Sequence, residues 1–294
     1  MPAETLRELS REIAARLQAA GVPSPDADAV ALLAHVAGRT LAEARLAEAR
    51  GDDAVGIDRA ALETVVKRRV AREPLQHIVG TAPFRTLTLV VGPGVFVPRP
   101  ETEIVAGVAI DAANRAASER AAEVADLCAG SGAIGLAVAT EVPRSHVTLV
   151  ELDVAAFAFL ERNVSAMPAD VRNRVATVRG DARTALAERD GAFDVVVANP
   201  PYVPHGAVPR DREVAEHDPA VALYGLGRDG LEVPRGIASA AARLLRPGGV
   251  FAMEHGEDQG AHVRAFLDGS PDWRDVRTHP DLTGRPRCSV AIRA

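Results

Sequence analysis

The sequence contains few aromatic residues, only two cysteines and hardly any lysine. Among its 294 residues are one Trp, two Tyr and seven Phe. The cysteines, Cys128 and Cys288, are far apart and lack metal-ligand spacing, so neither a disulfide framework nor a zinc site is indicated. Only one of the 34 basic residues, Lys67, is a lysine. With the abundant alanine, this arginine excess is typical of genomic base bias rather than of an arginine-rich binding surface.

Long hydrophobic runs and excess positive charge are missing too. Charged residues interrupt each apolar run well before the roughly 18 residues that indicate a membrane span. The first twenty residues mix glutamate and arginine with apolar residues, as in an amphipathic helix and unlike a signal peptide. The formal net charge of −6 argues against sequence-independent binding to a phosphate backbone. We therefore expect a cytoplasmic monomer that uses neither membrane nor direct nucleic acid contact.

Residues 1–73 are expected to form a helical domain that docks the substrate. Apolar residues recur at helical spacing from Leu6 to Leu17. Thr40, with Glu43 three residues later, has the spacing of a capping box and predicts another helix start. The segment "IDRAALETVVKRRVAREP" predicts a further helix that Pro74 ends. The domain contains 11 basic and 12 acidic residues, so it is not a basic recognition module.

Residues 74–100 are expected to form a β-hairpin linker. The stretch "FRTLTLVVGPGVFVPRP" is rich in β-branched residues and alternates in polarity. Gly92-Pro93-Gly94 lies in its middle and predicts the turn of the hairpin.

Strands and helices alternate from residue 101 to residue 294. Strand-like segments such as "AEVADLCAG", "HVTLVELD" and "FDVVVANPPY" are separated by helical ones such as "GAIGLAVATE". This alternation predicts an α/β fold with a doubly wound, largely parallel sheet and helices on both faces. Ligands of such sheets bind beyond the carboxyl ends of the strands, where the strand order reverses. The site residues should therefore lie in loops that follow strands.

The first strand–helix loop is glycine-rich. Gly130, Gly132 and Gly135 match the pattern G-x-G-x-x-G, which lets backbone approach a ligand closely. A tight turn without ligand would use the same glycines, and a dinucleotide would place its pyrophosphate at the helix N-terminus. Asp126, four residues before the first glycine, disfavours a pyrophosphate but suits a ligand with an ammonium and a sulfonium group. The loop therefore favours S-adenosylmethionine as the cofactor.

Two further strand ends carry carboxylates. Glu151 follows Gly132 by 19 residues and is placed to accept hydrogen bonds from both ribose hydroxyls. Asp181 follows the next strand and is placed to receive the exocyclic amine of adenine, with Ala182 supplying backbone. An aspartate after glycine is also common turn chemistry, so the assignment of Asp181 has a structural alternative.

The fourth strand, which lies beside the first in this topology, ends in Asn199-Pro200-Pro201-Tyr202, an unusual sequence for a buried strand to run into. The loops that follow these two strands are therefore expected to lie close together. Asn199 offers a side-chain carbonyl and Pro200 a backbone carbonyl without an N–H donor. Two acceptors in fixed geometry can hold the two hydrogens of a planar amino group, and Tyr202 supplies a flat face against it. Such acceptors favour the positive charge that develops on nitrogen during methyl transfer. We expect Asn199, Pro200 and Tyr202 to be catalytic and, together with Pro201, to form the substrate site. Asn199 is also expected to contact the cofactor.

Taken together, these motifs resemble those of class I S-adenosylmethionine-dependent amino-methyltransferases, and most closely the HemK/PrmC family of protein-glutamine N5-methyltransferases. The resemblance extends over almost the whole chain. It rests on the segments "PLQHIVGTAPF", "GVFVPRPETE", "DLCAGSGAIGLA", "NPPY", "ALYGLGRDGL" and "LLRPGGVFAMEHGEDQG". It implies a helical N-terminal domain, a hairpin linker and a Rossmann-like methyltransferase domain. The implied substrate is the glutamine of the Gly-Gly-Gln motif of peptide chain release factors.

The chain departs from the family pattern at several positions. Cys128 and Ala129 stand where the family usually has Gly-Thr, which bears on cofactor affinity. His77 replaces a usual tyrosine, and His255 replaces an apolar residue. The segment at residues 217–218 reads His-Asp, where an aromatic residue and glutamate are commoner. None of these departures removes a residue expected to act in the chemistry.

The segment "PRPETE" at residues 98–103 is expected to start a helix, because acidic residues favour the first turn. It could close over the cofactor with Arg99 or Thr102 near it, or serve as a rigid interdomain joint. The eight histidines are dispersed without ligand pairing, so no metal is expected.

Four alternatives to a release factor glutamine methyltransferase stay open. A ribosomal-protein glutamine methyltransferase and a nucleic-acid amino-methyltransferase would use the same Asn-Pro-Pro-Tyr chemistry. The net charge and the lack of a basic, aromatic-rich recognition segment oppose the nucleic acid enzyme. A nicotinamide-dependent oxidoreductase is opposed by Asp126 and by Asn199-Pro200-Pro201-Tyr202. A binder of translation factors that has lost activity is opposed by the same intact motif.

Overall fold

A computed structural model describes residues 4–294. The chain divides into two compact units. One comprises the chain up to residue 81 together with residues 210–217, and the other comprises residues 82–209 and 218–294. The three-part division expected from the sequence, with boundaries at residues 73 and 100, stays a prediction. Insertion of residues 210–217 into the helical unit was not foreseen from the sequence.

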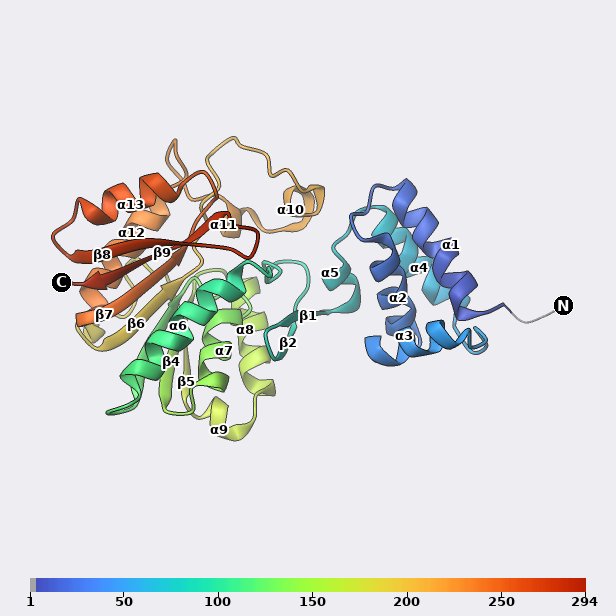
Figure 1. Cartoon of the computed structure of the whole chain (residues 1–294), viewed down its shortest axis with the longest axis horizontal. Helices are drawn as coiled ribbons and strands as arrows, with labels where there is room; N and C mark the ends of the chain where they lie inside the picture. Colours follow the sequence, from blue (N-terminus) through green and yellow to red (C-terminus); the bar gives the residue numbers. More distant parts are fainter. Residues whose placement is uncertain (1–3) are drawn as a thin grey trace. The chain divides into compact units, whose positions relative to one another are not determined.

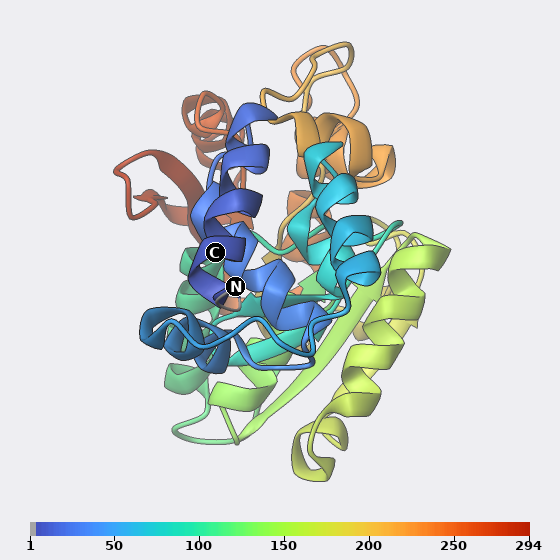
Figure 2. The same cartoon turned by 90° about the vertical axis from the view of Figure 1, so that its right-hand side faces the viewer.

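The helical unit begins with the helices that the sequence predicted. Two of them start with capping boxes, Thr5 with Glu8 and Thr40 with Glu43, and the second confirms the sequence prediction. Leu17, on the first helix, is fully buried in the core of this unit. The helices α1, α2 and α4 pack against one another (Figures 1 and 2). Their bounds are α1 Leu6–Ala19, α2 Pro25–Val36, α3 Leu41–Arg50, α4 Arg59–Val70 and α5 Leu75–Val79.

Partly buried ion pairs hold the inserted segment in the helical unit. This segment carries α10 (Arg212–His217). The carboxylate of Glu213 lies 2.6 Å from Arg72 Nη2 and 3.0 Å from Arg69 Nη1. Arg69 also donates to Asp28 at 2.7 Å. Burial raises the pKa of Glu213, but the hydrogen bonds from the two arginines outweigh it and bring the pKa to about 2.

The β-hairpin exists, but its turn is not where the sequence placed it. The strands β1 (Thr81–Phe84) and β2 (Leu87–Val90) pair in a two-stranded sheet. Their turn is at Arg85 and Thr86, and Arg85 adopts a φ of 52°. The predicted turn, Gly92-Pro93-Gly94, follows the second strand instead. The prediction was wrong because a turn without glycine carries a much weaker sequence signal.

The second unit contains a seven-stranded sheet with the order β5-β4-β3-β6-β7-β9-β8. The first five of these strands are parallel, and β9 pairs antiparallel with both β7 and β8. The strand order reverses between β3 and β6, as expected for a doubly wound sheet. The strands are β3 Ala122–Leu127, β4 Ser145–Glu151, β5 Val175–Arg179, β6 Phe193–Ala198, β7 Leu245–Glu254, β8 Trp273–Pro280 and β9 Pro286–Arg293.

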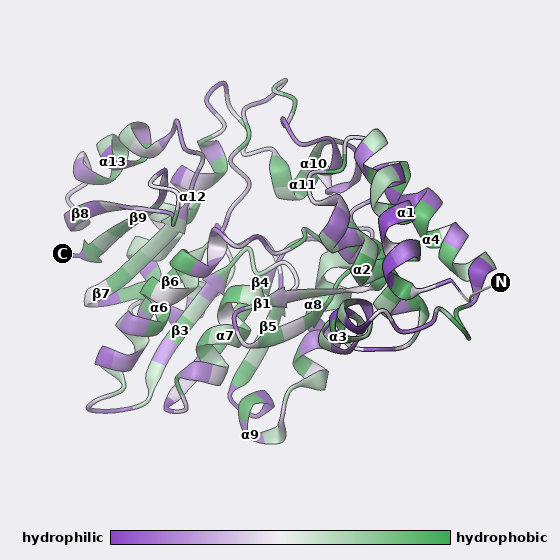
Figure 3. Cartoon of the chain, turned by 45° about the vertical axis from the view of Figure 1, so that its right-hand side comes forward, coloured by the Kyte–Doolittle hydropathy of each residue, from purple (hydrophilic) through white to green (hydrophobic). Residues whose placement is uncertain are grey.

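Helices cover both faces of the sheet, and each face has its own hydrophobic core (Figure 1). The apolar run of β6 serves both, because Val195 and Val197 face one core while Val196 and Ala198 face the other. In Figure 3 β6 is accordingly largely hydrophobic, whereas β8 at the edge of the sheet is largely hydrophilic. The helices and one 3₁₀ turn of this unit are α6 Thr102–Ala116, α7 Ala133–Glu141, α8 Val154–Ala166, α9 Ala169–Arg172, η1 Ala187–Arg189, α11 Ala220–Leu223, α12 Glu232–Leu244 and α13 Gly260–Asp268.

Candidate active site

The two motif loops lie beside each other at the strand-order switch. Leu127 at the end of β3 pairs with Ala198 at the end of β6 in parallel register. The glycine loop, residues 128–132, follows the first strand, and the Asn-Pro-Pro-Tyr loop, residues 199–202, follows the second. The structure thus confirms the expected proximity of the two loops.

Backbone conformation in the glycine loop explains why its glycines are needed. Gly130 and Gly132 have φ values of 57° and 90°, in the region that side chains disfavour. A Cβ on Gly132 would lie 2.7 Å from Leu160 Cδ1, so this glycine permits close packing. A Cβ on Gly130 would meet nothing within 4 Å, so the backbone of this glycine faces open space that a ligand can enter.

Asp126 supports the loop and keeps one oxygen free. The side chain is 1% exposed, and its Oδ2 accepts a hydrogen bond from the Gly135 N–H at 2.8 Å. Its Oδ1 is buried without a partner. Burial raises the pKa of Asp126 to about 7, helped by the nearby Glu151 and opposed by the Gly135 hydrogen bond. An unpartnered buried acceptor of this kind is suited to a ligand that brings a hydrogen-bond donor or positive charge.

Glu151 connects the end of β4 to the glycine loop. Its Oε2 accepts from the Gly130 N–H at 2.7 Å and its Oε1 from the Asp153 N–H at 2.8 Å. Burial raises the pKa of this carboxyl, and the backbone hydrogen bonds oppose the rise. Each carboxylate oxygen has about two acceptor sites, so capacity remains for ribose hydroxyls.

Asp181 is already paired with a neighbouring arginine. Its carboxylate lies 2.6 Å from Arg183 Nη2, and Oδ1 also accepts the Arg183 N–H at 3.0 Å. The Arg183 hydrogen bond lowers the pKa of Asp181. An adenine amine at Asp181 would have to share this carboxylate with Arg183. The roles of Asp181 and of the buried Ala182 beside it stay predictions.

In the second loop, the amide of Asn199 has a defined orientation. Its Nδ2 donates to Thr102 Oγ1 at 3.3 Å, which leaves Oδ1 available as an acceptor. Pro200 is buried, and Pro201 and Tyr202 are half-buried. The Tyr202 hydroxyl donates to Glu254 Oε1 at 3.4 Å. Burial, followed by the charge of Glu254, raises the pKa of Tyr202 far above its usual value, so the phenol stays protonated.

Two glycines outside both motifs let another segment pass close behind this loop. A Cβ on Gly230, whose φ is 71°, would lie 2.3 Å from the Tyr202 backbone oxygen. A Cβ on Gly225 would lie 2.6 Å from the Pro201 oxygen. Gln259 Nε2 donates to the Tyr202 oxygen at 2.8 Å and to the Asp229 oxygen at 2.9 Å. The segments containing these residues carried the family resemblance, but no local pattern in them predicted this role.

Arg99 of the "PRPETE" segment forms an ion pair with Asp218, one of the residues that depart from the family pattern. Its Nη2 lies 2.7 Å from Oδ2 of Asp218, whose side chain is inaccessible to solvent. The guanidinium also lies 5.1 Å from the centre of the Phe96 ring. Arg99 therefore anchors a neighbouring loop, whereas Thr102 contacts Asn199 directly.

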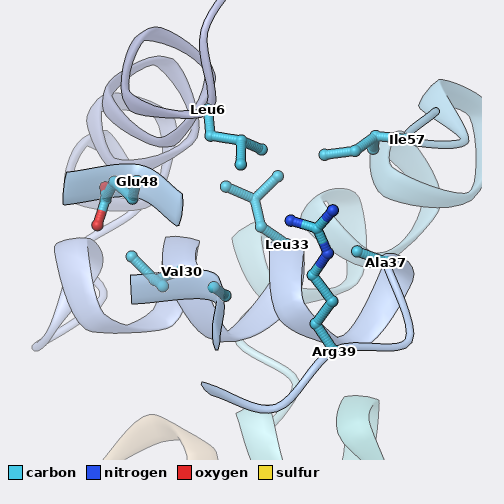
Figure 4. A pocket seen from close by; sticks show the side chains of 8 residues that line it. Leu6, Val30, Leu33, Ala37, Arg39, Glu48 and Ile57 are labelled. Atoms are coloured by element: carbon cyan, nitrogen blue, oxygen red, sulfur yellow. The ribbon is translucent and has the colours of Figure 1, made fainter. Parts of the chain in front are cut away.

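Other features of the described residues add no second candidate site. No group of three or more His, Cys, Asp or Glu among residues 4–294 could hold a metal ion. Over the same residues, no helix is both long and apolar enough to cross a bilayer. Figure 4 shows a small pocket in the helical unit where Arg39 extends between Leu33 and Ile57. None of the predicted site residues lines it.

Comparison with known proteins identifies the family. The PrmC N-terminal domain profile matches residues 8–80, and the methyltransferase small domain profile matches residues 87–216. A release factor glutamine methyltransferase of Streptomyces coelicolor is 47% identical over 283 residues, 95% of each chain. A 4-amino-L-phenylalanine/4-methylamino-L-phenylalanine methyltransferase of Streptomyces pristinaespiralis is 41% identical over 231 residues, 78% of this chain and 76% of its own. A solved structure of a T. thermophilus 16S rRNA N2 G1207 methyltransferase with AdoMet and guanosine aligns at 23% identity and a TM-score of 0.48, over 73% of this chain and 50% of that one.

The near full-length identity and the two domain profiles confirm the resemblance that the motifs carried. The fold, a largely parallel sheet covered on both faces and preceded by a helical region, agrees with it. The chain is a methyltransferase and belongs to the family of release factor glutamine methyltransferases.

Proposed function

We propose that this protein transfers a methyl group from S-adenosylmethionine to the side-chain amide nitrogen, N5, of the glutamine in the Gly-Gly-Gln motif of peptide chain release factors. The observation that carries this proposal is the orientation of Asn199. Its amide nitrogen is committed to Thr102, so its carbonyl oxygen is left to accept from a substrate. Strong identity to a release factor glutamine methyltransferase supports the substrate class.

The residues of the second loop hold the substrate amide. Asn199 Oδ1 and the Pro200 backbone oxygen accept the two amide hydrogens, and Pro200 has no N–H with which to repel them. Pro201 and the Tyr202 ring pack against the planar amide. The two acceptors also stabilise positive charge on the nitrogen as its conjugation is lost. Fixed geometry of this kind contributes several kcal/mol, up to about 7–11 kcal/mol.

Residues of the first loop and of the next strand ends bind the cofactor. S-adenosylmethionine supplies the methyl group when it is bound. The open space at Gly130 and the unpartnered Oδ1 of Asp126 are suited to its methionine end, where positive charge is carried. Glu151 accepts the ribose hydroxyls, and Asp181 with Ala182 binds the adenine.

The helical unit docks the protein substrate, because a single loop glutamine offers little binding area. The match of residues 8–80 to the PrmC N-terminal domain supports this role. The enzyme acts as a monomer in the cytoplasm, where translation termination takes place. An aromatic amine is a second candidate substrate, because the S. pristinaespiralis relative is named for one.

Methyl transfer with labelled cofactor tests this function. The full-length protein is incubated with methyl-labelled S-adenosylmethionine and, separately, with release factors, ribosomal proteins, DNA, RNA and 4-amino-L-phenylalanine. We expect label on the release factors alone, and peptide mapping should place it on the Gly-Gly-Gln glutamine.

Two controls make this result specific. A release factor whose Gly-Gly-Gln glutamine is changed to alanine should acquire no label. The enzyme variant Asn199→Ala, which keeps the cofactor-binding loop, should label the natural factor far more slowly. Label on ribosomal proteins, nucleic acid or the amino acid, with none on release factors, would refute the proposal.

A further inference from the structure

A buried glutamate lies behind the Asn-Pro-Pro-Tyr loop and has no role in the function proposed so far. Glu254 is the last residue of β7 and is 2% exposed. Its Oε1 accepts the hydroxyl hydrogen of Tyr202 at 3.4 Å. Its Oε2 is buried and has no partner at hydrogen-bond geometry. A buried carboxylate oxygen without a donor is costly, so its presence at this position calls for an explanation.

Thr102, at the start of α6, lies between this glutamate and the predicted substrate site. Its buried Oγ1 accepts from Asn199 Nδ2 at 3.3 Å. A hydroxyl that accepts one hydrogen bond still has its own hydrogen to donate. The Glu254 carboxyl lies near enough for the Thr102 hydroxyl to lower its pKa, although Oε2 has no partner at hydrogen-bond distance. The Thr102 hydroxyl can therefore donate its hydrogen, and Glu254 Oε2 has a free acceptor site for it.

The direction of these hydrogen bonds matters, because an asparagine amide can be held in two ways. If Thr102 accepts, it binds the amide nitrogen of Asn199 and the carbonyl oxygen points to the substrate. If Thr102 donates, it binds the carbonyl oxygen, and the amide N–H groups oppose the substrate N–H groups. An ionised carboxylate has acceptor sites only, so a Thr102 hydroxyl that bonds to Glu254 must be the donor, and its oxygen is then left to accept from Asn199.

We propose that Glu254 is a positioning residue whose carboxylate, acting through the Thr102 and Tyr202 hydroxyls, orients the Asn199 amide and the Tyr202 ring toward the substrate amide. This inference rests on the proposed function of Asn199 as the acceptor of the substrate N–H. Glu254 itself does not touch the reacting atoms.

The ionisation of Glu254 should then control turnover near neutral pH. Burial raises the pKa of this carboxyl to about 7, and Thr102 and Arg287 lower it while Glu101 raises it. A protonated Glu254 can donate to Thr102, which removes the fixed direction of the hydrogen-bond chain. Turnover should therefore rise with pH as Glu254 loses its proton. The titratable or charged groups facing or adjoining this carboxyl are Glu101, Tyr202, His255, Arg287 and Cys288.

The test uses the full-length enzyme and its release factor substrate, with kcat measured from pH 6 to pH 8 and cofactor affinity by calorimetry. Glu254→Gln replaces the acceptor-only group by one that can also donate. We expect kcat to fall on the order of tenfold, the cost of about one lost buried hydrogen bond. Its pH dependence through pH 7 should disappear, while the cofactor Kd should change by less than about twofold.

A matched pair at Thr102 separates orientation from general damage to folding. Thr102→Val keeps the shape but removes the hydroxyl, so its kcat should fall as in Glu254→Gln. Thr102→Ser keeps the hydroxyl and should retain kcat within about threefold, because the hydrogen-bond chain survives. Should Glu254→Gln fail to fold, the pH dependence of this pair decides the question: it should disappear in Thr102→Val and persist in Thr102→Ser, because Thr102 links Glu254 to Asn199.

Equal turnover of the two threonine variants would overturn the inference, as would wild-type kcat and pH dependence in Glu254→Gln. Activity of the wild-type enzyme is measured in the same assay, so loss of the proposed function would be recognised separately. In that case no enzyme, wild type included, would label the release factor.

Discussion

The two loops at the strand-order switch are built by opposite means. The glycine loop is shaped by side chains that are missing, since Gly130 and Gly132 adopt positive φ values and leave room for a ligand. The Asn-Pro-Pro-Tyr loop is shaped by rigid prolines and by hydrogen bonds from other segments. The first loop therefore leaves space for a ligand, and the second holds its side chains in fixed orientations.

The supports of the two loops also differ in sequence distance. Asp126 and Glu151 support the glycine loop from within 9 and 21 residues along the chain. The second loop depends on Thr102, 97 residues from Asn199, and on Glu254 and Gln259, 52 and 57 residues from Tyr202. Damage to the first loop should therefore appear in cofactor affinity, and damage to the second in turnover.

The largest effect is expected for Asn199→Ala. Loss of one preorganised acceptor should reduce turnover by about 10²–10³, or about 2.7–4 kcal/mol, by analogy with oxyanion-hole donors. The cofactor Kd should stay nearly unchanged, because the glycine loop is intact. Single-turnover methyl transfer to release factor measures the rate, and calorimetry measures the Kd. A rate equal to that of the wild type would mean that Asn199 only forms part of a turn.

Asn199→Asp sharpens the same comparison. A carboxylate still accepts both N–H hydrogens and stabilises positive charge on nitrogen more strongly than an amide oxygen does. We expect the aspartate variant to keep more activity than the alanine variant, with desolvation of its charge as the opposing effect. Equal rates for the two variants would show that the acceptor itself is not what the site needs.

Gly230→Ala tests the segment that passes behind the second loop. The new Cβ would lie 2.3 Å from the Tyr202 oxygen at a φ of 71°, so the loop has to move. Overpacking of this kind should lower the free energy of unfolding by about 1–3 kcal/mol and reduce kcat, with the cofactor Kd unchanged. Urea denaturation and steady-state kinetics measure the two effects.

The matched control is Gly191→Ala. Gly191 has a similar φ of 62°, but its Cβ would meet nothing within 4 Å. This variant carries the backbone strain without the collision, so it should be less destabilised and keep its kcat. If both variants lose kcat equally, contact with the Tyr202 backbone is not the cause.

Features that depend on residues close together in the sequence were predicted better than features that depend on contacts between distant segments. The glycine pattern, the strand ends and the neighbouring position of the two motif loops follow from short-range periodicity and sheet rules, and the structure confirms them. The roles of Thr102, Glu254 and Gln259 depend on contacts across 52 to 97 residues, which no local pattern encodes. The same reason explains why the attachment of Glu213 to Arg72 was missed.

Glu151→Ala tests the cofactor side with a smaller expected effect. Loss of charge-assisted hydrogen bonds should weaken S-adenosylmethionine binding by about 1–3 kcal/mol, or about 5- to 150-fold in Kd. Asp153→Ala is the control, because Asp153 caps α8 next to Glu151 without serving the predicted ribose site. It should cost about 1 kcal/mol of stability and leave the Kd unchanged. Unchanged affinity in Glu151→Ala would remove the ribose assignment.

The smallest effect concerns Cys128, where the family usually has glycine. Its φ of 69° lies in the left-handed region, which costs a residue with a Cβ about 1–2 kcal/mol. Cys128→Gly and Cys128→Ala both remove the thiol, so they differ only in this strain and in the greater freedom of unfolded glycine, worth about 0.4–1 kcal/mol.

The strain outweighs the unfolded-state term, so the glycine variant should be more stable than the alanine variant by about 1 kcal/mol. Urea denaturation gives this difference, and calorimetry measures how each substitution changes the cofactor Kd. An alanine variant at least as stable as the glycine variant would show that the loop relaxes around a side chain. The conformation of the glycine loop would then not require the absence of side chains, in contrast to the difference between the two loops drawn above.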